Sequence, residues 1–194
     1  MITEKKYLEI RKTWAPSKVY ANWHEIESRL RILYKYGLRY LAKRDVIEPG
    51  ANAGIAAVMV SPFINSYVGL EMDERYFKNQ LTYTEKFIEC PHEIHNKTFG
   101  EYLSAGGKVG NALFASFVLY HFSDAEIDVI KEKVLPNINS FVIMNRGVDR
   151  KLNKNKYIFN RIRNTEKFLT DNGFKVPLAM WDKHKVFYLM VGTK

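Results

Sequence analysis

Cysteine and long apolar runs are what this chain most clearly lacks. Cys90 is the only cysteine among 194 residues, so no internal disulfide can form. No apolar stretch reaches the roughly 18 residues that a membrane-spanning helix needs. The first residues, Met1–Lys6, contain no apolar core of a secretory signal. We therefore expect a cytoplasmic protein without a membrane partner.

The sequence also lacks a pattern of metal ligands. His92, His95 and His184 are scattered, and no close cluster of acids and histidines accompanies the single cysteine. A metal site draws on several such ligands at short, regular spacing, so we expect no bound metal. Internal repeats and long linkers are absent as well. With 46% apolar residues, the chain fits one domain with a substantial core.

Positive charge dominates the chain, but its distribution is uneven. Residues 1–44 and 142–194 carry net charges of +7 and +8, whereas residues 45–141 carry −6, for a total of +9. Basic flanks can attract an anionic partner, either RNA or a phosphorylated or carboxylated small molecule. A protein with no anionic partner, whose soluble surface simply has more lysines than acids, would have the same net charge.

Small residues are concentrated in one stretch, Asp45–Gly54, that leads into the apolar run Ile55–Val60. This pattern indicates a short strand, a tight turn and a helix, an arrangement that brings backbone close to a nucleotide-like ligand. Gly50 and Gly54 remove side chains where the loop bends, and Asn52 is the non-glycine residue best able to adopt a positive φ. The spacing differs from the G-x-G-x-x-G of NAD enzymes.

A second signal is the acid Glu71, which ends the short stretch Tyr67–Leu70 and lies 21 residues after Gly50. In a βαβ unit this spacing places a carboxylate where it can accept hydrogen bonds from ribose hydroxyls. Together, E-P-G-A-N-A-G and V-G-L-E-M-D resemble the first two motifs of class I S-adenosylmethionine (SAM)-dependent methyltransferases. The glycine loop of that family usually reads E/D-x-G-x-G-x-G, and here Asn52 stands at the middle glycine.

The resemblance implies SAM as cofactor, S-adenosylhomocysteine (SAH) as product and no metal. It places the loop around the methionine moiety, Glu71 at the ribose and Met72 on the adenine, although Glu71 could be a surface acid and Met72 a core residue. The implied cofactor-binding residues are Glu48, Gly50, Ala51, Asn52, Gly54, Glu71, Met72 and Phe117. Phe99, Glu101 and Tyr102 are within range of the adenine, without a fixed register.

Strand-like and helix-like stretches alternate along most of the chain. The expected strands span residues 45–48, 66–71, 86–90, 111–117, 141–144, 174–180 and 185–191. The expected helices span residues 3–13, 22–43, 53–61, 73–83, 126–134 and 152–172, with a short helix or turn at 98–103.

Alternation predicts a parallel sheet with helices on both faces, and the closing pair of strands predicts an antiparallel hairpin. We therefore expect an α/β, doubly wound, mostly parallel seven-stranded sheet, which is the class I methyltransferase fold. The core domain would span residues 22–194, and residues 1–21 would form a lid at the substrate entrance.

His121 is the candidate general base, because an imidazole titrates near neutrality and can take a proton from a hydroxyl or amine. It could instead be held by backbone near the start of the following helix. Tyr120 could contact the substrate or the SAM sulfonium, since aromatic faces attract cations. Both belong to the run Ala115–Phe122, which resembles the segment after the fourth strand in small-molecule and some RNA methyltransferases.

The candidate substrate-binding residues come from the two ends of the chain. Trp14, Tyr20 and Trp23 could line the substrate entrance, or simply anchor the N-terminal segment on the core. Arg146 and Arg150 open a basic stretch, residues 146–167, in which aromatic residues are interleaved. Such a stretch can grip phosphates and stack bases, or be a solvated helix face.

The most favoured function is methyl transfer from SAM to an oxygen or nitrogen of a small anionic molecule. Two alternatives remain, an RNA methyltransferase that uses residues 146–167 and a catalytically idle SAM-fold partner protein. The N/D-P-P-Y/F loop of enzymes that methylate DNA base amines is absent, as is the lysine and acid set of ribose 2′-O-methyltransferases. An NAD-type oxidoreductase is disfavoured by the glycine spacing and the closing hairpin.

Overall fold

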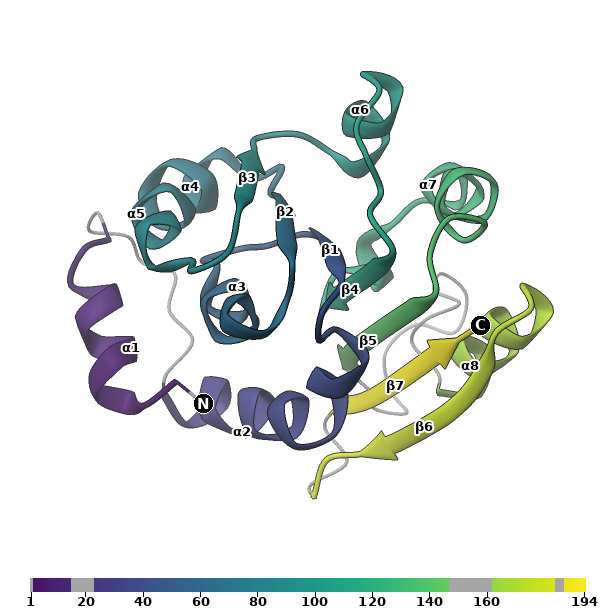
Figure 1. Ribbon diagram of the computed structural model, residues 1–194, viewed down its shortest axis with the longest axis horizontal. Coiled ribbons are helices and arrows are strands. Elements are labelled where there is room, and N and C mark those ends of the chain that lie inside the picture. Colours follow the sequence, from purple (N-terminus) through teal and green to yellow (C-terminus); the bar gives the residue numbers. More distant parts are fainter. Residues whose placement is uncertain (1, 15–22, 147–161, 184–186) are drawn as a thin grey trace.

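The structure is a computed structural model that describes residues 2–14, 23–146, 162–183 and 187–194. These residues contain a seven-stranded sheet with the strand order β3-β2-β1-β4-β5-β7-β6 (Figure 1). The strands are β1 (Asp45–Pro49), β2 (Ser66–Leu70), β3 (His92–His95), β4 (Ala112–Ser116), β5 (Ser140–Arg146), β6 (Lys175–Trp181) and β7 (Phe187–Thr193). Neighbouring strands in the part β3-β2-β1-β4-β5 of the sheet are parallel, and β7 runs antiparallel to β5 and β6. The predicted doubly wound sheet with a closing hairpin is confirmed.

The order of the strands reverses between β1 and β4. The chain moves outward from β1 through β2 to β3, and then returns to pair β4 with the other side of β1. In open α/β sheets, ligands bind outside the carboxyl ends of the strands at such a reversal. The glycine loop follows β1 directly, so the fold places this loop at the expected ligand position.

Each face of the sheet is covered by its own cluster of buried apolar side chains, because successive residues of a strand point to opposite faces. On β4, Phe114 belongs to one cluster, and Leu113 and Ala115 belong to the other. The first cluster includes residues from α1 (Glu4–Arg11), α2 (Trp23–Ile32) and α3 (Ile55–Val60). The second includes residues from α6 (Phe99–Ser104), α7 (Asp124–Val129) and α8 (Ile162–Asp171).

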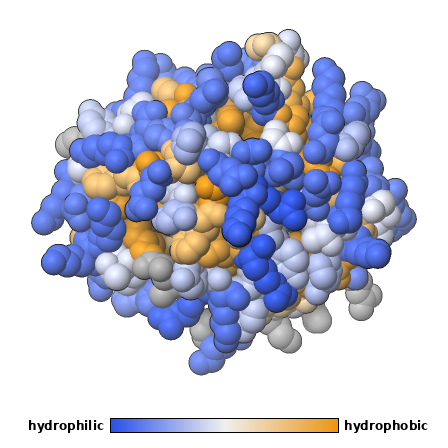
Figure 2. Space-filling model, viewed as in Figure 1, coloured by the Kyte–Doolittle hydropathy of each residue, from blue (hydrophilic) through white to orange (hydrophobic). Residues whose placement is uncertain are grey.

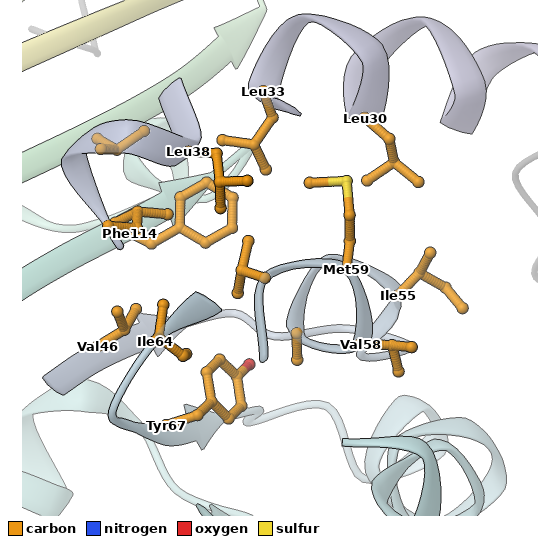
Figure 3. Close-up of a cluster of buried hydrophobic side chains, with 14 of the residues drawn as sticks. Leu30, Leu33, Leu38, Val46, Ile55, Val58, Met59, Ile64, Tyr67 and Phe114 are labelled. Atoms are coloured by element: carbon orange, nitrogen blue, oxygen red, sulfur yellow. The ribbon is translucent and has the colours of Figure 1, made fainter. Parts of the chain in front are cut away.

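Apolar residues at helical spacing place α2 on the first face. Leu30 and Leu33 lie above α3, toward Met59, in Figure 3. The helix continues beyond Ile32 as a π-helical turn, Leu33–Gly37, and a 3-10 turn, Leu38–Tyr40. The long helix predicted there is therefore present, with two changes of pitch.

The other predicted helices are also present, several with changes of pitch. The helix at 73–83 comprises α4 (Glu74–Tyr76), a π-helical turn (Phe77–Leu81) and α5 (Thr82–Thr84), followed by a 3-10 turn (Glu85–Phe87). A 3-10 turn (Ser61–Phe63) follows α3, another (Leu119–His121) precedes α7, and α7 ends in a π-helical turn (Ile130–Val134). Of the helix predicted at 152–172, residues 162–171 form α8, and residues 152–161 lie outside the described ranges.

The prediction of a third strand at residues 86–90 is wrong. Residues 85–87 form a 3-10 turn, and the strand is His92–His95. The apolar residues Ile88 and Cys90 made this stretch resemble a strand. They are instead buried in the first cluster, in the connection that leads to the true strand. The true strand lies at the edge of the sheet, where one side is unpaired and polar residues are tolerated.

Hydrophobic side chains reach the surface in patches between hydrophilic ones on the face drawn in Figure 2. Within the part of the chain that the structure describes, no helix has the length and apolar character needed to cross a membrane.

Candidate cofactor and acceptor site

The loop after β1 turns repeatedly through left-handed backbone conformations. Gly50, Asn52 and Gly54 have φ angles of 67°, 52° and 73°. The N–H of Ala51 donates to the carbonyl of Leu70 at the end of β2, with an N–O distance of 2.9 Å. The positive φ of Asn52 agrees with its predicted role as a substitute for glycine.

Gly50 is also a point of close approach. A Cβ added there would lie 2.6 Å from Cγ2 of Val118, which follows β4. Gly50→Ala is therefore expected to lower the free energy of unfolding by about 1–3 kcal/mol, since it combines a disfavoured φ with a clash. Denaturant unfolding measures this. Gly100→Ala is the matched control, because a Cβ there meets nothing within 4 Å; equal losses in the two variants would contradict the assignment.

The carboxylate of Glu71 joins the loop to the end of β2. One oxygen accepts from the N–H of Asn52 at 2.7 Å, and the other accepts from the N–H of Asp73 at 2.8 Å. The residue is buried, with 5% of its surface exposed. Burial raises the pKa of this carboxyl above its ordinary value, and the backbone hydrogen bonds oppose the rise. The Glu71 carboxylate therefore joins the β1 loop to the turn after β2.

Glu48 is the second acid of the site, and it is almost fully buried in β1. The hydroxyl of Tyr67 donates to Oε2 of Glu48 at 2.7 Å. Glu48 pairs with Gly69 in the register of β1 and β2, and a Cβ at Gly69 would lie 2.8 Å from the Tyr67 ring. The missing side chain lets that ring reach Glu48. Burial raises the pKa of Glu48 to about 8, the Tyr67 hydrogen bond opposes the rise, and the charge of Glu71 adds to it.

A cavity of about 910 Å³ opens beside this loop. Its walls include the loop after β1, the end of β2 with the turn that follows, the residues just before α6, the segment after β4, and the apolar side of α2. Acids from the ends of β1 and β2 line one part, and apolar side chains of α2 line another. A volume in this range is typical of a small-molecule site.

Most of the predicted cofactor residues line this cavity. They are Glu48, Gly50, Ala51, Asn52, Glu71, Met72 and Phe117. Gly54 lies behind the wall, where it precedes α3 and where a Cβ would meet Leu81 at 2.8 Å.

Of the three residues proposed near the adenine, only Phe99 lines the cavity. Glu101 instead accepts from the backbone N–H and hydroxyl of Thr98 in a capping box at the start of α6. The Tyr102 hydroxyl donates to the carbonyl of Lys108. These two contacts give both residues structural roles.

The candidate catalytic and substrate residues are only partly brought together. His121 is exposed on the 3-10 turn after β4 and lines the cavity. Trp14 also lines it, and its indole N–H donates to Oγ1 of Thr84 at 2.8 Å. Trp23 is not among the lining residues and packs on Tyr7, with ring centroids 5.4 Å apart. Tyr20, Arg150 and the side chains of Tyr120 and Arg146 lie outside the described part of the structure.

Sequence reasoning missed Arg29, which lines the cavity from α2. Its guanidinium carbon lies 4.2 Å from the centroid of the Phe117 ring. The available signal was its position, because Arg29 falls within the apolar spacing of Ile26, Leu30 and Leu33. A cation within the apolar spacing of a helix is uncommon.

Among the described residues, no group of three or more histidines, cysteines and acids could hold a metal ion. That result concerns those residues only. It leaves the expectation of a metal-free site as a prediction.

No family model and no curated protein matches this sequence. Its structure resembles a precorrin-6y C5,15-methyltransferase from Geobacter metallireducens GS-15, with 16% identity, a TM-score of 0.63, and coverage of 94% of this chain and 95% of that chain. Magnesium protoporphyrin IX methyltransferase from Synechocystis PCC 6803, solved with bound SAM, has 11% identity, a TM-score of 0.63, and coverage of 98% and 92%.

A third similar structure is an RNA methyltransferase candidate, PH1948, from Pyrococcus horikoshii. It has 13% identity and a TM-score of 0.62, with 99% of both chains covered. The similar structures thus include small-molecule methyltransferases and a candidate RNA methyltransferase. With its strand order and its loop after β1, the chain has the fold of the class I SAM-dependent methyltransferases.

Proposed function

We propose that this protein binds SAM in the cavity beside the β1 loop and transfers its methyl group to an oxygen or nitrogen of a small anionic acceptor. The observation that carries the proposal is the joining of Asn52 to the Glu71 carboxylate at the reversal of strand order. A glycine-type loop held against an acid at this point suits a ligand with a ribose and a charged tail.

The residues of the cavity suit SAM group by group. Each oxygen of Glu71 accepts one backbone N–H and retains acceptor capacity for a ribose hydroxyl. Glu48 offers a carboxyl group to the ammonium of the methionine moiety. Met72 is 69% exposed and offers an apolar side chain to the adenine. When bound, SAM would supply an electrophilic methyl group.

The chain would contribute orientation and proton transfer. Holding two reactants in the right geometry can supply about 7–11 kcal/mol of barrier reduction. His121 would take the proton that an acceptor hydroxyl or amine loses, and would return it to water, since its side chain is exposed. Arg29 and the apolar residues of α2 would hold the acceptor.

RNA methylation is the second candidate function. The similarity to PH1948 over 99% of both chains and the net charge of +9 favour it. RNA binding through the basic flanks would weaken steeply as salt rises, because phosphate contacts release counterions. A small-molecule enzyme would bind RNA weakly, and its acceptor affinity would depend much less on salt.

Calorimetric titration with SAM, SAH and NAD tests the cofactor directly. We expect Kd values in the micromolar range for the two SAM compounds and no binding of NAD. Binding of NAD alone would favour an oxidoreductase. If SAM binds but neither small acceptors nor RNA are methylated, the idle partner interpretation replaces the enzyme.

A further inference from the structure

The stretch of chain over residues 28–44 contains six lysines and arginines and no acid. It comprises the end of α2, the π-helical and 3-10 turns that continue it, and the turn before β1. Arg29 borders the cavity and Arg31 pairs with Glu27, whereas the other four cations do neither. Together with two exposed aromatic residues, those four form what we call the basic–aromatic surface: Tyr34, Lys35, Arg39, Lys43, Arg44 and Phe63.

Contacts between two segments of the chain make this surface continuous. The ring of Tyr34 meets that of Phe63 edge-on, with centroids 6.0 Å apart. The N–H of Lys43 donates to the carbonyl of Phe63 at 2.7 Å. Lys35 follows Tyr34 directly, and Arg39 comes about one helical turn later. Cations and exposed rings therefore lie beside one another.

Neutral rings, and not acids, are the partners of two of these cations. Nζ of Lys35 lies 5.0 Å from the centroid of the Tyr36 ring. The guanidinium carbon of Arg39 lies 4.7 Å from the centroid of the Tyr40 ring, and its Nη2 donates to the Tyr40 hydroxyl at 2.8 Å. Within the described ranges, none of the four cations of the surface forms an ion pair with a carboxylate. Their positive charge is therefore available to an anionic partner.

The backbone of Lys43 supports a role for its side chain. Lys43 follows the last helical turn with a φ of 57°, a conformation that glycine or asparagine usually adopts at this position. Residues held in such conformations lower stability and cluster at functional sites. An exposed lysine at a position that favours glycine suggests that its charge is used.

The basic–aromatic surface is separate from the cavity. None of its six residues is among those that line the cavity. Arg44 comes just before β1, so this end of the surface lies at the amino end of that strand, whereas the loop beside the cavity follows the carboxyl end. A partner bound here would leave the cavity accessible.

We propose that the basic–aromatic surface binds single-stranded RNA. Cations that contact phosphates and exposed rings that stack on bases are the two elements with which proteins hold single strands. Tyr34 and Phe63 are 39% and 40% exposed, so both rings can be reached by a base. The Tyr34 hydroxyl offers a hydrogen-bond partner to a ribose 2′-hydroxyl, which DNA lacks. The inference does not depend on SAM binding.

A membrane surface fits these residues less well. A helix that lies on a membrane needs an exposed apolar face beside its cations. The apolar residues of this helix, Leu30, Leu33 and Leu38, are instead buried in the first cluster and point into the core in Figure 3. The exposed side therefore offers charge and rings, and RNA is the partner that uses both.

Fluorescence anisotropy with a labelled 15-nucleotide oligouridylate tests the charges. We expect the triple variant Lys35→Gln, Arg39→Gln, Lys43→Gln to bind at least tenfold more weakly than the unaltered protein at 50 mM salt. The slope of log K against log salt should become shallower by about 2, because each phosphate contact to a single strand contributes about 0.7.

The matched control is the triple variant Lys6→Gln, Lys78→Gln, Lys131→Gln. It removes the same number of charges, but each of its lysines pairs with a neighbouring acid. Its affinity for the oligouridylate should stay within threefold of the unaltered protein. Equal losses in the two triple variants would overturn the inference, because total charge alone would then explain binding. Absence of RNA binding at 50 mM salt would overturn it as well.

The aromatic contribution is tested separately. Tyr34→Ala should weaken binding at least fivefold and leave the salt slope unchanged, since stacking releases no counterions. Tyr83→Ala, at a ring that is 43% exposed on α5, is the control and should have no effect. Equal affinity for oligothymidylate DNA, or binding to vesicles of phosphatidylcholine and phosphatidylserine but not to RNA, would overturn the assignment to RNA. Because no cofactor is present, these outcomes are independent of the proposed methyl transfer.

Discussion

Glu71→Ala is expected to weaken SAM binding tenfold to a hundredfold, equivalent to about 1.4–2.8 kcal/mol. Two effects combine in this loss. The variant removes the carboxylate that would accept hydrogen bonds from the ribose, and it releases the N–H groups of Asn52 and Asp73 that this carboxylate now holds. Hydrogen bonds to a charged group contribute about 1.5–3 kcal/mol each, so even partial compensation by water leaves a large loss.

Calorimetry with SAM and with SAH measures this loss. Glu74→Ala is the matched control, because Glu74 is exposed, pairs with Lys78 and does not line the cavity. Its affinity for SAM should stay within twofold of the unaltered protein. An unchanged affinity in a folded Glu71→Ala variant would remove Glu71 from the cofactor site.

Glu48→Gln is expected to change how stability depends on pH. Burial raises the pKa of Glu48 to about 8 in the folded protein, against 4.5 for an ordinary glutamate. Between these two values the folded state retains a proton that the unfolded state has lost. The free energy of unfolding therefore falls as pH rises through this window, and the fall is complete above the folded pKa.

Glutamine cannot ionise, so the variant lacks this component while its amide oxygen can still accept from Tyr67. From about pH 5.5 to pH 8, stability should shift by about 3 kcal/mol in favour of the variant relative to the unaltered protein. Denaturant unfolding at both pH values measures the shift. Glu89→Gln, at an exposed position, is the control. Parallel pH curves for Glu48→Gln and the unaltered protein would show that Glu48 is charged throughout.

The sequence predicts those features of the site that depend on local backbone chemistry. A glycine-type loop between a strand and a helix could be recognised from Gly50, Asn52 and Gly54, and their positive φ angles agree with that interpretation. The alternation of strands and helices, with no room for a helix before the last strand, predicted the sheet and its hairpin. Each of these signals can be recognised from residues that are close together in the chain.

Features that depend on tertiary neighbours could not be predicted in this way. The contact of Tyr67 with Glu48 depends on the parallel register of β1 and β2 and on the open space above Gly69. The third strand was misplaced because its apolar neighbours, Ile88 and Cys90, pack on the core without pairing. The place of Arg29 in the cavity wall could be predicted only by knowing which side of α2 borders the cavity. The roles of His121 and Trp14 in catalysis and substrate binding stay predictions.

The hydrogen bond between Glu71 and the Asn52 amide determines when the loop loses its conformational entropy. If only the ligand ordered the loop, the loop would lose its conformational entropy at binding. The free energy of that loss would then be subtracted from the binding free energy. Here the bond ties the loop to the end of β2, which pairs with β1, so we expect the loop to be ordered together with the sheet. The free energy of ligand contacts would then appear almost undiminished in the affinity, and a compact chain of 194 residues would need few additional contacts to bind its cofactor.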